Sequence, residues 1–185
     1  ITVLEIAILR ARFVEFFTLR YGPFGYNDPK NFTTTSVKHL ELLGKIQNSF
    51  GKSKEEFIEH FRSKYSDKYL PLWMVAEIAS FGEIMTMVNE MHPKEKTDFF
   101  KPYGVRNKFM DSWLRSLNYV RNCCAHHGRL WNRALAIKPL LPDKRERPDF
   151  NAIFFYNSRI FAVLTITQYL LNIIDPSHTW DKDLL

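Results

Sequence analysis

Apolar side chains recur at intervals of three or four residues along nearly the whole chain, and no segment alternates apolar and polar residues over the length of a strand. The clearest stripe predicts one central helix over residues 71–91. Further helices are predicted over residues 2–20, 36–49, 53–65, 94–100, 107–127 and 151–174. The expected fold class is therefore all-α, a helical bundle.

The chain has 185 residues, and its hydrophobic share of 45% suffices for one sizeable core, so we expect a single domain over residues 1–185. Ile1 already lies inside the first predicted helix, and we therefore expect helices before it to be missing. The longest apolar run, residues 160–174, contains polar residues and is shorter than the roughly 20 residues that cross a bilayer. We expect it to be a core helix and the protein to have no membrane partner.

The two cysteines, Cys123 and Cys124, are adjacent within a predicted helix, which is a poor geometry for a disulfide. This usage suits a reducing compartment, and we expect a cytoplasmic protein. Together with His126 and His127 the cysteines also suggest zinc, but a closed site needs four converging ligands and the chain offers no second Cys/His pair. We expect neither a metal nor a cofactor.

Residues 120–133, the motif segment, place arginine, amide and histidine side chains along one predicted helix. Helical geometry divides the surrounding positions into a polar and an apolar stripe. The polar stripe consists of Asn118, Asn122, His126, Arg129 and Arg133. The apolar stripe consists of Trp113, Leu117, Val120, Cys124 and Trp131. His126 is expected to point away from the core, His127 to lie near the apolar stripe, and Gly128 to cap the helix before a basic loop over residues 129–150.

The net charge of +6 is concentrated around the motif segment. Residues 101–135 contain seven lysines and arginines against one acidic residue, Asp111. A local positive field of this kind favours polyanions through steering and counterion release. The alternative interpretation is a solvated basic face that pairs with acidic helices.

The residue chemistry of Arg121 and His126 suits RNA cleavage without a metal, because RNA carries its own nucleophile, the 2′-hydroxyl group. An imidazole exchanges a proton near neutral pH, and a guanidinium stabilises charge on phosphoryl oxygens. Asn122, one turn before His126, is the candidate to orient the imidazole. An ideal helix points Arg121 and His126 about 140° apart. Either the helix end departs from ideal geometry, or a twofold dimer supplies a second copy of the motif.

The tryptophans Trp113 and Trp131 allow two interpretations. Their rings suit stacking on bases, but core-facing tryptophans more often serve packing. The candidates for RNA binding are Arg115, Asn118, His127, Arg129 and Arg133.

Several ordered blocks resemble the Abi-like family of bacterial abortive infection, of AbiD and AbiF type, within the HEPN superfamily. The resemblance covers about residues 10 to 135. The blocks are Arg20-Tyr21-Gly22-Pro23, residues 57–61, 70–74 and 77–82, and above all residues 112–122, 124–127 and 129–133.

The resemblance implies a HEPN helical bundle in which the arginine and histidine of the family motif are Arg121 and His126, followed by Asn122 as the polar residue. It further implies a toxin of phage defence, a metal-independent endoribonuclease that leaves 2′,3′-cyclic phosphate ends at a site shared across a homodimer. RNA is the implied target, and a small regulatory RNA is a further implied partner.

Two alternatives remain open beside the nuclease. The same basic face suits a non-catalytic RNA-binding module that clamps a structured small RNA. A helical bundle that binds only proteins is the third interpretation, and it predicts no affinity for RNA.

Overall fold

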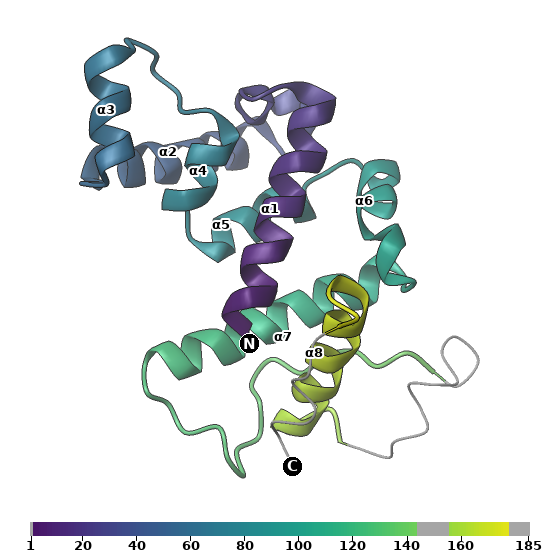
Figure 1. The fold of residues 1–185 in the computed structure, drawn as a ribbon. Coiled ribbons are helices and arrows are strands. Elements are labelled where there is room, and N and C mark those ends of the chain that lie inside the picture. Colours follow the sequence, from purple (N-terminus) through teal and green to yellow (C-terminus); the bar gives the residue numbers. More distant parts are fainter. Residues whose placement is uncertain (1, 144–155, 178–185) are drawn as a thin grey trace. The chain divides into compact units, whose positions relative to one another are not determined.

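The computed structural model describes residues 2–143 and 156–177, which form helices and contain no strand (Figure 1). The prediction of an all-α fold is thereby confirmed. The α-helices are α1 (Thr2–Tyr21), α2 (Ser36–Lys52), α3 (Glu56–Lys64), α4 (Leu72–Ile78), α5 (Phe81–Asn89), α6 (Pro93–Phe100), α7 (Asn107–Ala125) and α8 (Ile160–Ile174). Three short 3-10 helices are η1 (Gly25–Asn27), η2 (Pro29–Asn31) and η3 (Lys101–Tyr103).

The chain divides into two compact units. One unit comprises residues 1–6 and 100–185, and the other comprises residues 7–99. The expectation of a single domain stays a prediction, and each unit is described by itself.

The core of the unit formed by residues 7–99 is aromatic. Phe13 and Phe17 project from α1 and are fully buried. The Phe17 ring stacks on that of Phe32 with centroids 5.2 Å apart, and the Phe13 ring meets the edge of Phe99 at 6.3 Å. Aromatic pairs in such geometries add to the gain from burial. The ring of His39 packs against Phe32, and its Nε2 lies 3.2 Å from the carbonyl oxygen of Asn27.

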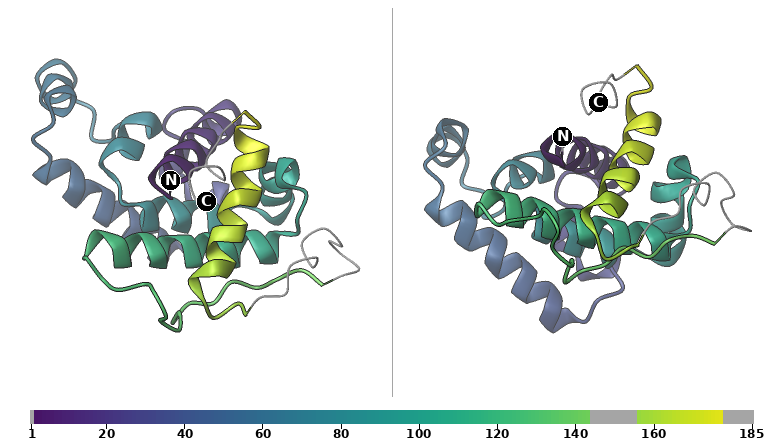
Figure 2. Two further views of the ribbon diagram at one scale, coloured as in Figure 1. Left: turned by 60° about the horizontal axis from the view of Figure 1, so that its bottom comes forward. Right: turned by 90° about the horizontal axis from the view of Figure 1, so that it is seen from below.

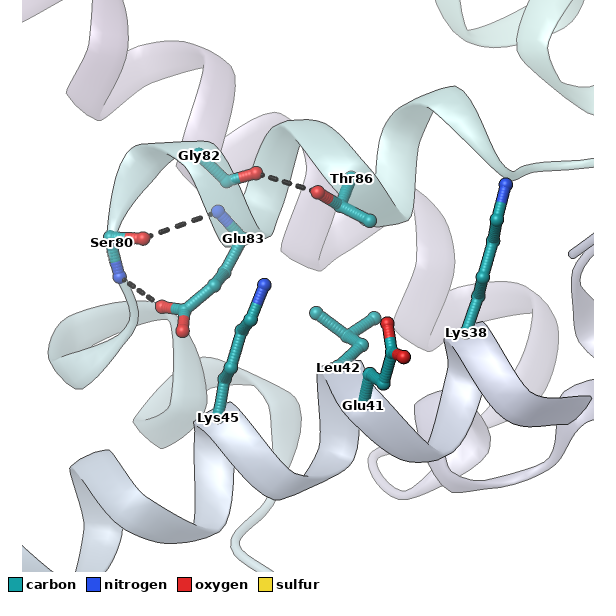
Figure 3. A pocket seen from close by; sticks show the side chains of 8 residues that line it. All are labelled: Lys38, Glu41, Leu42, Lys45, Ser80, Gly82, Glu83 and Thr86. Carbon is teal, nitrogen blue, oxygen red and sulfur yellow. Dashed lines mark hydrogen bonds between the residues drawn. The ribbon is translucent and has the colours of Figure 1, made fainter.

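The central helix predicted over residues 71–91 is in fact two helices, α4 and α5, which both contact α2. Ala79 and Ser80 between them adopt extended backbone with ψ angles of 145° and 155°. Ser80 and Glu83 form a capping box (Figure 3): the Ser80 hydroxyl accepts from the Glu83 amide, and the Glu83 carboxylate accepts from the Ser80 amide at 2.6 Å. This reciprocal pair starts α5 inside a continuous apolar pattern, because it satisfies amide groups that a helix start leaves unpaired.

The spacing of Ser53 and Glu56 in the sequence is that of a capping box and predicts a helix start at Ser53, but the structure has no box there. The helix α3 begins at Glu56 after Glu55 as its N-cap residue, and the Ser53 hydroxyl accepts from the Glu55 amide at 3.3 Å instead. Ser53 therefore lies two residues before the N-cap position that a box serine would occupy.

The other unit is organised around α7 and α8 (Figures 1 and 2). Trp113 on α7 is fully buried, and its ring meets that of Tyr169 on α8 edge to face at 5.6 Å. The Tyr169 hydroxyl donates to the carbonyl oxygen of Tyr103 in η3. These contacts join the middle of α7 to α8 and to η3.

The last helix begins at Ile160, whereas the apolar pattern predicted a start at residue 151. Residues 151–155 lie outside the described part of the chain. Residues 157–159 form turns, and Arg159 has extended backbone with φ −115° and ψ 156°. The Ser158 carbonyl oxygen accepts from the Leu135 amide at 2.8 Å, so this segment bonds the preceding loop and is not part of α8.

Among the described residues, none of the helices combines the length and the hydrophobicity needed to cross a bilayer.

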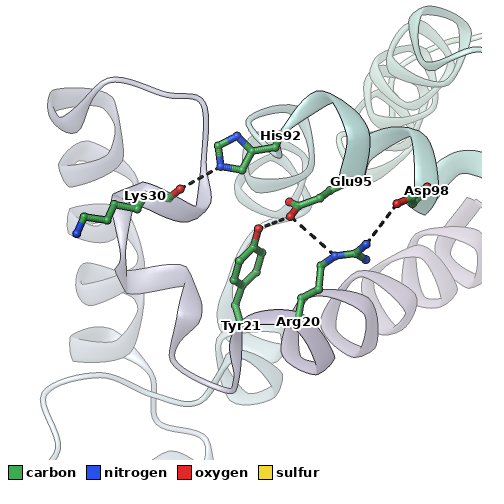
Figure 4. A network of polar contacts seen from close by, with 6 residues as sticks. All are labelled: Arg20, Tyr21, Lys30, His92, Glu95 and Asp98. Carbon is green, nitrogen blue, oxygen red and sulfur yellow. Dashed lines mark hydrogen bonds and ion pairs between the residues drawn. The ribbon is translucent and has the colours of Figure 1, made fainter.

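A polar network joins the end of α1 to α6 (Figure 4). The Tyr21 hydroxyl donates to Glu95 Oε1, and Arg20 bridges to Glu95 and Asp98 with N–O distances of 3.8 and 3.3 Å. Burial and the hydrogen bond to Glu95 raise the pKa of Tyr21 from 10.0 to about 12. Burial also raises the pKa of Tyr26, whose hydroxyl donates to the Leu70 carbonyl at 2.8 Å.

The free energy of unfolding should fall as the pH rises from about 10 towards 12. The folded state holds the Tyr21 proton to a higher pKa than the unfolded chain, so alkaline solution favours unfolding in that window. Tyr21→Phe should lower stability near neutral pH by about 1 kcal/mol, since a hydrogen bond is lost, and should make the alkaline decline shallower. Urea unfolding at several pH values measures both effects. An equally steep decline in Tyr21→Phe would contradict the assignment.

Candidate nucleic-acid interface

The helix α7 carries the motif segment with one face in the core and the other in solvent. Trp113, Leu117 and Val120 are buried, as the apolar stripe predicts. On the other side, Asn118 is half-buried, and five of the predicted site residues on or just after α7 are exposed. They are Arg115, Arg121, Asn122, His126 and His127.

The helix ends two residues before the predicted boundary, in a Schellman motif. The Gly128 amide donates to the Cys123 carbonyl oxygen at 2.7 Å, and the His127 amide donates to the Cys124 carbonyl oxygen at 3.0 Å. His126 is the C-cap residue, with φ −99° and ψ 19°. These bonds satisfy carbonyl groups that a helix end leaves unpaired.

His127 occupies the left-handed position of this motif with φ 54°, a place that glycine usually takes. The predicted cap residue, Gly128, comes one position later, where it serves a different purpose. A Cβ atom at residue 128 would lie 3.0 Å from the Cys123 carbonyl oxygen. Glycine at residue 128 avoids a tight contact with the backbone of Cys123. His127 adopts a left-handed backbone, which is unfavourable for a residue with a side chain.

Three positions were predicted on or near the apolar stripe but are exposed: Cys124, His127 and Trp131. The left-handed turn at residue 127 redirects the chain and removes Trp131 from the helical register. Cys124 still lies within the last turn of α7, where it is exposed. Trp131 is 81% exposed, whereas Trp113 is fully buried. Packing therefore accounts for Trp113 and leaves the ring of Trp131 open to a ligand.

The Arg121 guanidinium donates from Nη1 to Asn122 Oδ1 at 3.0 Å. The His126 amide donates to the Asn122 carbonyl oxygen at 3.1 Å, but among the described residues no hydrogen bond joins the Asn122 side chain to the His126 imidazole. In this structure the Asn122 side chain therefore bonds the arginine. The expectation that Asn122 orients the imidazole stays a prediction.

The loop after α7, described over residues 129–143, is tied down at three places. Asn132, which also has a left-handed backbone with φ 51°, accepts from Arg159 Nη1 at 3.3 Å, and the Leu135 amide donates to Ser158. Farther along, the Trp113 indole donates to the Leu140 carbonyl oxygen at 2.6 Å. The loop thereby presents Arg129, Trp131 and Arg133 as exposed side chains. Residues 144–150 of the predicted basic loop lie outside the described part of the chain.

A cavity of about 480 Å³ lies between α2 and α5 in the other unit (Figure 3). Its charged lining is balanced, because Lys38 and Lys45 of α2 are matched by Glu41 of the same helix and by Glu83 of α5, which already serves the capping box. Such a lining does not attract a polyanion, and we therefore assign this cavity no part in RNA binding.

The described residues contain no group of three or more histidine, cysteine, aspartate or glutamate side chains placed to hold a metal ion. Cys123 and Cys124 both have free thiols. The four residues considered for zinc therefore do not converge as ligands.

The family model described as Abi-like protein matches residues 1–132, from α1 through the motif segment to Asn132. No curated protein and no solved structure matches the chain.

Gly128→Ala should lower the free energy of unfolding by about 1 to 3 kcal/mol, since the added methyl group would press on the backbone of Cys123. Gly44→Ala is the matched control, because the space around residue 44 in α2 is open. Removing a helical glycine there should raise stability by about 0.5 to 1 kcal/mol. Urea unfolding measures both, and equal effects of the two substitutions would contradict the close approach at residue 128.

Proposed function

The chain belongs to the Abi-like family, which indicates a part in abortive infection, the defence of bacteria against phage, and we propose that it acts there as a metal-independent endoribonuclease. In this proposal it is a HEPN-type toxin that works on RNA in the cytoplasm. The observation that carries the proposal is the joint exposure of Arg121, Asn122 and His126 at the end of α7, with Arg121 held by Asn122.

The proposed reaction is transfer of the phosphoryl group to the neighbouring 2′-oxygen. The 2′-hydroxyl loses its proton to the His126 imidazole, a bond forms from the 2′-oxygen to phosphorus, and the bond from phosphorus to the 5′-oxygen breaks. The leaving 5′-oxygen takes a proton from an imidazolium group. The products are a 2′,3′-cyclic phosphate and a 5′-hydroxyl. Arg121 stabilises the negative charge that develops on the phosphoryl oxygens.

A homodimer supplies the second imidazolium in this proposal. Arg121 and His126 are five residues apart, so α7 points them in different directions. The Schellman motif begins only at His126, and Arg121 lies within the regular helix. The helix end therefore does not bring the two side chains together, which favours the second copy among the two solutions that the spacing allows.

The exposed groups around the catalytic residues would hold the RNA strand. Arg115, Arg129 and Arg133 offer forked donors to phosphates, while Asn118 and His127 offer neutral hydrogen-bonding groups. A small regulatory RNA would occupy the same surface as the target and so block it.

Arg121→Ala and His126→Ala should each lower the rate of RNA cleavage by at least about 100-fold, without a change in the free energy of unfolding larger than about 0.5 kcal/mol, since both side chains are exposed. His60→Ala, an exposed histidine on α3, is the matched control and should cleave as the wild type does. Gel analysis in EDTA, with detection of cyclic phosphate ends, provides the measurement. Undiminished EDTA-resistant cleavage by both variants would refute the assignment.

The second candidate function is RNA binding without cleavage, which the exposure of Trp131 favours, because stacking on a base needs no catalytic group. Trp131→Ala should weaken binding of single-stranded RNA by about 1 to 3 kcal/mol. Binding is measured in the His126→Ala background so that the RNA stays intact. An RNA with an abasic site at the contacted nucleotide should show a smaller effect of Trp131→Ala. Binding without any cyclic phosphate product from the wild type would leave this candidate in place of the nuclease.

A further inference from the structure

A second cavity, of about 360 Å³, lies along α7 on the N-terminal side of the motif segment. Its charged lining is predominantly basic: Lys108 and Arg115 come from α7, and Lys138 comes from the loop opposite. Asp111 is the one acidic side chain among its described lining residues. We call it the basic cavity. Its lining differs from that of the cavity between α2 and α5, where positive and negative side chains are equal in number.

The wall of the basic cavity that carries Lys138 is fixed to α7. The Leu140 amide donates to the Ser112 hydroxyl at 2.8 Å, and the Leu140 carbonyl oxygen accepts from the Trp113 indole at 2.6 Å. The Pro139 carbonyl oxygen accepts from the Asn157 side chain at 3.2 Å. Leu140 thus bonds α7 through both its amide and its carbonyl oxygen, and the bond from Asn157 holds the preceding residue of the loop. The backbone that carries Lys138 is therefore held beside α7 before any ligand arrives, which lowers the cost of ordering on binding.

The basic cavity lies on the same face of α7 as the proposed catalytic end. Seven residues separate Arg115 from Asn122, which is about two turns, so the two positions lie within about 20° of each other around the helix axis. Arg115 precedes His126 by about 16 Å along the axis, at a rise of 1.5 Å per residue. A strand whose scissile phosphate reaches His126 can therefore run along this face into the basic cavity.

We propose that the basic cavity is a phosphate-binding subsite, in which Lys108, Arg115 and Lys138 hold a backbone phosphate of the RNA strand away from the bond that is cut. Neither Arg115 nor Lys138 forms a hydrogen bond or ion pair with a described residue, and both are exposed, so their charges are available to a ligand. This inference rests on the proposed function, because the strand is the one that the motif segment would cleave.

Lys138→Gln and Lys108→Gln test the subsite in the 185-residue chain that carries His126→Ala, with fluorescein-labelled single-stranded RNA and anisotropy as the readout. Each should weaken binding and reduce the slope of log affinity against log salt concentration by about 0.7, the value for one phosphate contact on a single strand. Lys101→Gln is the matched control, since Lys101 is exposed in η3 of the same unit and lies outside the described lining of the cavity. The control should leave the slope unchanged.

A second measurement separates a strand phosphate from free phosphate. RNA should protect Lys108 and Lys138 from acetylation, as read by mass spectrometry, and should leave Lys101 reactive. Inorganic phosphate at the same phosphate concentration should protect none of the three. If inorganic phosphate without RNA protects Lys108 and Lys138, the cavity is a site for small anions and the proposal is overturned.

The outcomes distinguish the subsite from the nuclease. Equal changes of slope in Lys138→Gln and Lys101→Gln, with RNA still bound, would overturn the subsite while the proposed function stands. A chain that binds no RNA in any variant would overturn both.

Discussion

The buried indole of Trp113 is the contact on which the geometry of α7, α8 and the loop between them depends. Its ring packs against Tyr169 of α8, and its nitrogen donates to Leu140 in the loop. A fully buried indole nitrogen needs an acceptor, and the backbone carbonyl of Leu140 supplies it at 2.6 Å. One side chain therefore fixes both the packing of two helices and the path of the loop. The positions of the exposed basic residues on α7 and on the loop therefore depend on the contacts of this buried ring.

The fold class could be predicted because helical periodicity is a local property, and its limits appear where local rules compete. The apolar pattern over residues 71–91 continues through Ser80, but the side chains of Ser80 and Glu83 satisfy the start of a new helix and break the pattern in two. The spacing Ser-x-x-Glu was visible at Ser80 and would have located the break. At Ser53 the same spacing is present without a box, because the serine hydroxyl bonds the amide two residues on.

In the candidate site, the exposure of residues on α7 was predictable, but side-chain partners and the positions of loop residues were not. The exposure of Arg121, Asn122 and His126 follows from the helical period, since the residues opposite them are apolar. The hydrogen-bond partner of the Asn122 side chain cannot be predicted from the helical period. Arg121 and His126 are both candidate partners of this amide, and only side-chain geometry decides between them. The exposure of Trp131 depends on the left-handed turn at His127, which periodicity ignores. Lys138 was missed because it lines the same cavity as Arg115 only through the bonds of Leu140 to residues of α7 that lie 27 or 28 positions earlier.

The left-handed backbone of His127 also gives a criterion for interpreting sequence variation at this position. Glycine and asparagine adopt that conformation more readily than histidine does, so architecture alone would let either of them replace it. Persistence of an imidazole at this position among relatives would then have to be explained by its side-chain chemistry. Replacement by glycine or asparagine would instead indicate that residue 127 serves only the backbone turn at the end of α7.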